Sequence, residues 1–204
     1  MNPAKQQILE TAARLFEKQG YHATGLSEII RESGAPKGSL YYYFPEGKEQ
    51  IGAETALWSG AQMGERIRFG LAQAEKPSEA VHLLAQGIAR AVEQSGFTAG
   101  GPLMILAAES AVNSEQLNQA CREAYEQMQA VFAEKFSGDV DLAQFVISTL
   151  EGAILLSRVQ HSGEPLRRVA ERLKTYIGSL EKLNGAQYGR QGSAANPGAH
   201  SFSE

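Results

Sequence analysis

This 204-residue sequence is poor in cysteine and has no arrangement of residues typical of a metal site. Its one cysteine, Cys121, excludes an internal disulfide, and this composition is typical of a reducing compartment. The four histidines are isolated, and neither a His-Glu-x-x-His motif nor a paired-cysteine spacing occurs. We therefore expect no metal site, no cofactor and no catalytic residue, and we do not expect an enzyme.

Long apolar runs are also missing. The richest stretch, residues 145–156, is interrupted by Ser148, Thr149 and Glu151, and it falls short of the roughly 20 apolar residues that span a bilayer. The N-terminal sequence MNPAKQQ lacks the apolar core of a signal peptide. We therefore expect a cytoplasmic protein that has no membrane partner.

The chain has no excess of positive charge. Its 19 basic and 23 acidic residues give a formal net charge of −4, and residues 1–50 contain as many acidic as basic side chains. This balance argues against a protein that binds nucleic acid through electrostatic attraction alone. It is compatible with a protein that holds DNA through a few well-placed donors and has weak non-specific affinity.

Residues 25–48 have the pattern of a helix-turn-helix. The helical run over residues 26–33 must end at residues 34–36, Gly-Ala-Pro, because glycine favours positive φ and proline lacks a backbone N–H. A second run begins at Lys37 and ends before Pro45, which disfavours helical geometry in the residue that precedes it. Two short helices joined by a three-residue turn that contains glycine indicate a helix-turn-helix.

The second of these helices has an unusual outer face. At about 100° per residue, Leu40 and Phe44 share one face, which leaves two small residues and three consecutive tyrosines on the others. Small residues allow a close approach to DNA, phenol groups donate hydrogen bonds to phosphates, and aromatic edges contact thymine methyl groups. Alternatively, the tyrosines pack between helices with their hydroxyl groups in solvent. The residues alone leave both interpretations open.

Two segments of the chain resemble a known signature. Residues 20–29, GxxATxxxEI, and residues 34–51, GAPKGSLYYYFPEGKEQI, resemble the DNA-binding signature of the TetR/AcrR family of bacterial regulators. The chain departs from the usual pattern by one extra residue between Phe44 and Lys48. This extra residue and the segment SGFTAGGP at residues 95–102 are similar to sequences of the LmrA/YxaF-like branch, whose members are associated with drug and flavonoid responses.

The resemblance implies a transcriptional regulator, which we expect to be a repressor released from a palindromic operator by a small hydrophobic or aromatic inducer. A helical small-molecule-binding or adaptor protein without DNA binding is the alternative. The candidate DNA contacts are Thr24, Lys37, Gly38, Ser39, Tyr41, Tyr42, Tyr43 and Lys48.

The whole chain is predicted to be all-α, with about nine helices and no strand-like alternation. We expect residues 1–47 to form the helix-turn-helix DNA-binding domain and residues 48–183 a ligand-binding and dimerisation domain. A long helix over residues 48–74 would begin beside the DNA-binding helices. Residues 184–204, rich in Gly, Ser, Ala and Asn, are predicted to be a disordered tail.

The last two helices, about 140–160 and 165–183, are predicted to form the interface of a homodimer. Residues 145–156 are apolar on nearly every side, so this helix must be covered all round. One face would meet its own domain and the other a second copy of the chain. The alternative is that this helix is central within a monomer.

A pocket for the inducer is predicted between the helices of the larger domain. Aromatic residues and methionines adapt to flat hydrophobic ligands, and carboxylates within apolar helices are candidate ligand anchors or acids. Each candidate is also compatible with an ordinary place in the core. The candidate lining is Trp58, Met63, Phe97, Met104, Glu109, Tyr125, Met128, Phe132 and Glu151.

Overall fold

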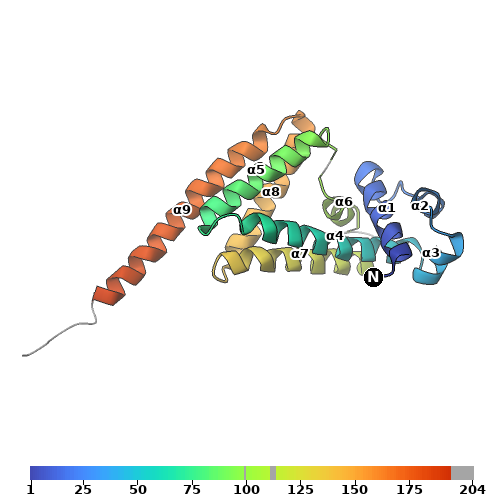
Figure 1. The fold of residues 1–204 in the computed structure, drawn as a ribbon, viewed down its shortest axis with the longest axis horizontal. Helices are drawn as coiled ribbons and strands as arrows, with labels where there is room; N and C mark the ends of the chain where they lie inside the picture. The colour runs from blue at the N-terminus through green and yellow to red at the C-terminus, as the bar shows by residue number, and fades with distance from the viewer. Residues whose placement is uncertain (99, 111–113, 194–204) are drawn as a thin grey trace, which may run out of the picture.

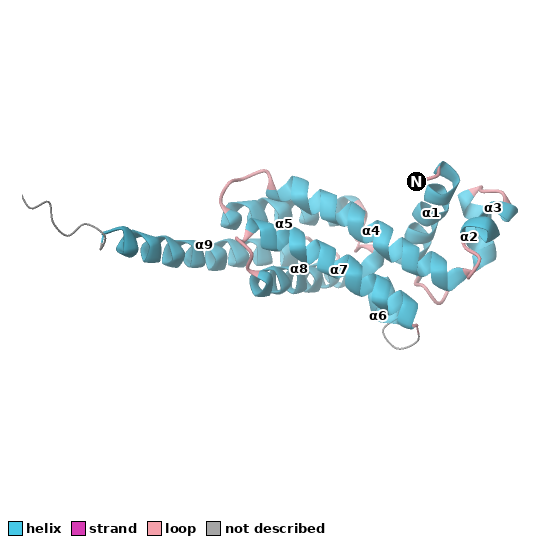
Figure 2. Cartoon of the chain, turned by 90° about the horizontal axis from the view of Figure 1, so that it is seen from below, coloured by secondary structure: helices cyan, strands magenta, loops and turns pink. Residues whose placement is uncertain are grey.

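The computed structural model describes residues 1–98, 100–110 and 114–193, and for Lys37, Ser110 and residues 184–193 it describes the backbone alone. Within this part the chain forms nine helices and no strand, which confirms the predicted all-α fold. The helices are α1 (Pro3–Gln19), α2 (Leu26–Ser33), α3 (Lys37–Tyr43), α4 (Lys48–Leu71), α5 (Pro77–Gln94), α6 (Pro102–Ser110), α7 (Glu115–Lys135), α8 (Val140–Gln160) and α9 (Glu164–Ser193). Figures 1 and 2 show an elongated molecule with α1–α3 at one end and α9 reaching out at the other.

Helices α1 to α3 form a small head whose buried apolar side chains are continuous with the core of the larger domain. The side chains of Phe16, Ile29, Leu40 and Phe44 are at most 1% exposed, as expected for residues on the inner faces of three short helices. Helix α2 ends at Gly34, whose φ of 64° is left-handed and favours glycine. The turn that follows directs α3 away from α2, as the helix-turn-helix pattern predicted.

Helix α4 joins the head to the larger domain. Its 24 residues extend about 36 Å at 1.5 Å per residue, and Figure 1 shows it running from the head along α7. At Gly60 a Cβ atom would lie 2.6 Å from the Cβ of Ala124 on α7, so glycine is needed for this close approach. The helix ends at Leu71, three residues earlier than expected.

Helix α8 is more exposed than a core helix. Over an 18-residue window its mean hydropathy is 1.4 and only 28% of the window is buried. By length and composition alone it is long and apolar enough to cross a membrane, and within the described ranges it is the one helix that is; the core helices of soluble proteins pass the same test. The helix therefore presents an apolar face that the monomer leaves uncovered.

Helix α9 continues beyond the end that we expected. The expected boundary at Leu183 is wrong, because the helix runs to Ser193. Residues 184–193 contain Ala, Gln and Arg, which favour helix, but also three glycines, which do not; the first proline after this segment is Pro197. Residues 194–204 lie outside the described residues, so their disorder stays a prediction.

Candidate functional site

The outer face of α3 is open to solvent. Tyr41 is 52% exposed and Tyr42 is 78% exposed, although both are large aromatic side chains. At Gly38 a Cβ atom would meet nothing within 4 Å, and Ser39 beside it is half-buried. Leu40 and Phe44 point into the head. Helix α3 thus presents a surface that is small at its start and aromatic towards its end.

Tyr43 differs from its two neighbours. Its ring is half-buried against the core of the molecule and meets the ring of Tyr42 edge-on, with centroids 5.0 Å apart. Its backbone oxygen accepts a hydrogen bond from Gln50 Nε2 at 3.2 Å. Of the two interpretations left open by the sequence, packing fits Tyr43, and an exposed recognition surface fits Tyr41 and Tyr42.

The flanking candidates have structural roles. Thr24 is 1% exposed and its hydroxyl donates to the backbone oxygen of Gly20 at 2.7 Å, so this side chain does not reach the surface as a DNA contact must. Lys48 Nζ donates to the backbone oxygen of His22 at 3.2 Å and lies 4.5 Å from the ring centre of Tyr21. Partial burial lowers the pKa of Lys48, and Glu109 opposes that shift. The side chain of Lys37 lies outside the described residues.

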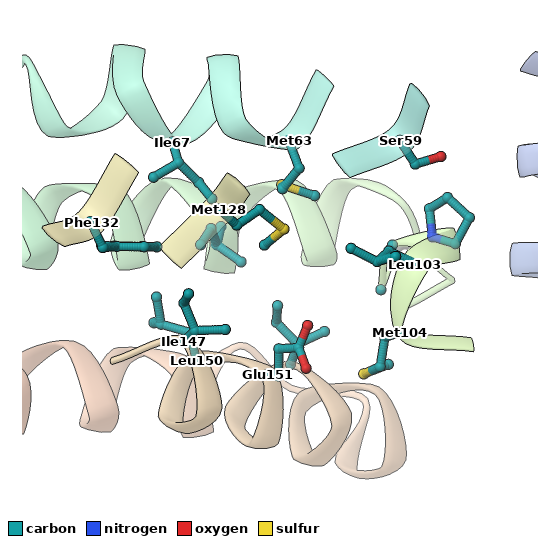
Figure 3. Close-up of a pocket in the computed structure, with 15 residues that line it drawn as sticks. Ser59, Met63, Ile67, Leu103, Met104, Met128, Phe132, Ile147, Leu150 and Glu151 are labelled. Carbon is teal, nitrogen blue, oxygen red and sulfur yellow. The ribbon is translucent and has the colours of Figure 1, made fainter. Parts of the chain in front are cut away.

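An apolar chamber of about 70 Å³ lies inside the larger domain. Figure 3 shows side chains from α4, α6, α7 and α8 converging on it. Five of the predicted ligand contacts line it: Met63, Met104, Met128, Phe132 and Glu151. The sequence did not single out Ser59, Ile67, Leu103, Ile147 and Leu150, which complete much of the wall and carry no signal apart from helical spacing.

The chamber has two polar features. Tyr125 does not line the chamber itself, but its hydroxyl group donates a hydrogen bond to Glu151 Oε1 at 2.6 Å. Burial raises the pKa of the Glu151 carboxyl, opposed by this hydrogen bond, and burial also raises the pKa of Tyr125. Ser59 Oγ is buried and has no hydrogen-bond partner among the described residues. Ser59 and Glu151 can therefore form a hydrogen bond with one polar group of a ligand that is otherwise apolar.

Three predicted pocket residues lie elsewhere. Trp58 packs against the core but does not line the chamber, because the helix turns by about 100° between it and Ser59, which does. Phe97 sits in the loop after α5 with a φ of 64° and contacts the ring of His161. Glu109 faces the head, where one carboxylate oxygen accepts the backbone N–H of His22 at 2.9 Å.

A larger groove of about 570 Å³ lies between α4 and α5 and adjoins the chamber. Met63, Ile67, the loop residues Gly100 and Gly101, and Pro102 at the start of α6 line both, so the two spaces are adjacent. The sequence identified residues 95–102 as part of a family resemblance and predicted Phe97 of this segment as a pocket residue, whereas Gly100, Gly101 and Pro102 are the residues that border the cavities. A glycine-rich loop between helices is the signal that could have indicated it.

Glu151 makes the stability of the fold depend on pH. The pKa of Glu151 is raised in the folded state. Below its ordinary value of 4.5 the carboxyl is protonated in both states and does not lower the free energy of unfolding. As pH rises from there through the folded-state pKa, the free energy of unfolding decreases. We expect Glu151→Gln to flatten this decline, so that its gain in unfolding free energy over the parent chain grows between acidic and neutral pH. Chemical denaturation at several pH values measures this difference, and a gain independent of pH would contradict it.

Comparisons with known proteins agree with this geometry. Residues 8–55 match the family described as bacterial regulatory proteins of the tetR family, and residues 77–172 match the C-terminal domain of LmrA/YxaF-like transcriptional regulators. The HTH-type transcriptional regulator YxaF of Bacillus subtilis is 36% identical over 85% of this chain and 95% of its own length. For LmrA of the same organism the identity is also 36%, over 82% and 93%.

Solved structures support the same fold. The reduced form of Escherichia coli NemR superposes with a TM-score of 0.77 at 23% identity, covering 85% of this chain and 96% of that one. A TetR regulatory protein from Rhodobacter sphaeroides gives 0.75 at 20% identity, covering 85% and 98%. With a helix-turn-helix head, a nine-helix fold over the described residues and these relatives, the chain belongs to the TetR family of DNA-binding transcriptional regulators, in its LmrA/YxaF-like branch.

Proposed function

We propose that this protein is a cytoplasmic, homodimeric repressor that leaves a palindromic operator when a small hydrophobic or aromatic molecule binds the larger domain. The observation that carries the DNA-binding half is the outer face of α3, where Gly38 leaves open space and two tyrosines are exposed. A recognition helix of this kind enters the major groove, and a dimer places two of them about one helical turn apart.

The surface of α8 supports a dimer. Phe145, Gly152, Leu156 and Val159 recur at helical spacing, and the three large side chains are between 48% and 72% exposed. On α9, Tyr176 is 48% exposed and its ring contacts Phe145. Apolar stripes on two neighbouring helices suit a four-helix interface with a second copy. This arrangement supports the interface predicted for the last two helices.

Two carboxylates connect the head to α6 and supply a route for the ligand response. Glu17 on α1 accepts the backbone N–H groups of Gly100 and Gly101, both at 2.8 Å, and these glycines border the chamber and the groove. At the other end of α6, Glu109 holds the backbone N–H of His22. A ligand that displaces the loop before α6 would therefore move α1 directly, in addition to any tilt of α4.

The Glu17 contact makes a testable difference to amide exchange. Glu17→Ala removes a charged acceptor from two backbone N–H groups, and hydrogen bonds to charged groups contribute about 1.5–3 kcal/mol. We expect hydrogen exchange at Gly100 and Gly101, followed by NMR, to accelerate by at least about tenfold. Glu10→Ala, on an exposed part of the same helix, is the control. Unchanged exchange at both glycines would contradict a head-to-loop connection.

The function itself is tested by fluorescence anisotropy with DNA from the region upstream of the gene. The proposal requires binding that survives an excess of competitor DNA, and release when a ligand is added. A chain that binds small molecules and has no preference for its own upstream DNA would instead be the helical binding or adaptor protein that the sequence left as the alternative.

A further inference from the structure

The volumes of the two cavities differ in a way that bears on the ligand. Drug-sized ligands occupy pockets of about 300–1,000 Å³. The inner chamber, at about 70 Å³, is too small for such a molecule, whereas the groove between α4 and α5, at about 570 Å³, is large enough. Because the two spaces are adjacent and have lining residues in common, a ligand in the groove can extend a narrow part into the chamber if these side chains move aside.

Gly87, in the middle of α5, keeps this groove open. A glycine inside a helix costs roughly 1 kcal/mol relative to alanine, so its presence requires a reason. At Gly60 and Gly70 the reason is packing, since a Cβ would lie 2.6 Å from a side-chain atom of the neighbouring helix. At Gly87 the nearest atom is a guanidinium nitrogen of Arg90 at 3.9 Å. A side chain there would project into the groove, which Gly87 lines.

The groove carries positive charge at its edge. Arg66 on α4 and Arg90 on α5 both line it, both are exposed, and neither has an ion-pair or hydrogen-bond partner among the described residues. The one acidic residue of the lining, Glu17, already accepts the two loop N–H groups. Phe69 and Leu83, 73% and 39% exposed, add apolar surface beside the arginines. The groove is thus suited to an apolar body with a negative end.

The inner end of the combined site suits an uncharged group. Its carboxyl, Glu151, is bound by the Tyr125 hydroxyl and has no cation beside it among the described residues, and the Ser59 hydroxyl is unpartnered. A negative group placed beside Glu151 in an apolar chamber would be repelled and poorly solvated. The negative charge of a ligand therefore belongs at the outer end.

We propose that the groove and chamber together bind an elongated amphiphile with one acidic group, which lies between Arg66 and Arg90 while the apolar body passes Gly87 towards the chamber. The inference rests on the proposed ligand response and specifies the chemical class of its ligand. The two guanidinium groups select the acid, and the space above Gly87 accommodates the body.

Calorimetric titration of the full chain with matched probes tests this assignment. The probes are decanoate, decan-1-ol and decylammonium, and as a flat pair 2-naphthoate and naphthalene-2-carboxamide. In at least one series we expect the carboxylate to bind about tenfold more tightly than its uncharged partner. This difference in affinity corresponds to the contribution of one charge-assisted hydrogen bond. Arg66→Gln combined with Arg90→Gln should remove this preference and leave the affinity for the uncharged probe unchanged.

Substitutions at Gly87 test the position of the apolar body. Gly87→Phe should abolish binding of every probe, whereas Gly87→Ala should retain binding and raise the melting temperature, because alanine fits beside Arg90 and favours helix. Binding that survives Gly87→Phe, equal affinity for acid and uncharged probes, or no binding of any probe would overturn the inference. Operator binding without ligand, and release by an uncharged molecule, are measured separately, so the proposed function can stand if this ligand class fails.

Discussion

Gly38→Glu should leave the chain folded and weaken specific operator binding by at least about 100-fold. Gly38 is the second residue of α3 and a Cβ there meets nothing within 4 Å, so the larger side chain has room. A carboxylate in the first turn of a helix is also favourable for the helix. On DNA it would separate two exposed tyrosines from the bases and repel phosphate. Two lost contacts of about 1–3 kcal/mol each account for the expected factor.

The control for Gly38→Glu is Gln62→Glu, which adds the same charge on an exposed position of α4, away from α3. Anisotropy titration measures operator affinity, and circular dichroism with thermal melting checks the fold. If Gly38→Glu folds and binds the operator as tightly as Gln62→Glu does, α3 does not approach DNA through this face.

Leu156→Glu should convert a dimer into a monomer at micromolar concentration. Leu156 is 51% exposed on the apolar stripe of α8, so the substitution should change the stability of the monomer little. In a two-fold interface the same change buries two carboxylates that have no partner, which costs several kcal/mol for each ion. Sedimentation velocity distinguishes the two states. Loss of the dimer should also lower the affinity for the operator, because two half-sites are no longer bound together.

Val140→Glu is the matched control for the dimer interface. Val140 is 53% exposed in the first turn of the same helix, away from the stripe, and an acidic residue there favours the helix. We expect this variant to sediment as the parent chain does. A dimeric Leu156→Glu variant would place the interface elsewhere and contradict a dimer built on the α8 stripe.

The sequence predicted the fold well because its signals are local. The left-handed Gly34 and the proline after α3 end two short helices, and helical spacing separates Leu40 from Tyr42. Each of these features acts within a few residues, where backbone sterics and side-chain period decide the outcome. The same is true of the helices in the described part of the chain, apart from the far end of α9, which continues through Asn184 and Gly185 although these residues favour a helix end.

The site was harder to predict because its parts come together across the fold. Ser59 lines the chamber and Trp58 does not, and nothing in the local sequence separates them apart from the direction in which α4 meets α7. Glu109 had the properties of a buried anchor, and the packing of α6 against α1 places it on the head instead. Lys48 likewise turns inward to His22. Such assignments depend on crossing angles between helices, which one sequence does not determine.

The most direct test of the account is competition for DNA by the unmodified protein. A labelled duplex from the upstream region is titrated in anisotropy against an unlabelled scrambled duplex of the same length and composition, at physiological salt. We predict a preference for the upstream sequence of at least about 1,000-fold, the lower end for specific DNA-binding proteins, with weak affinity for the scrambled duplex because the head has no excess positive charge. Equal affinity for the two duplexes would contradict a sequence-reading role for α3.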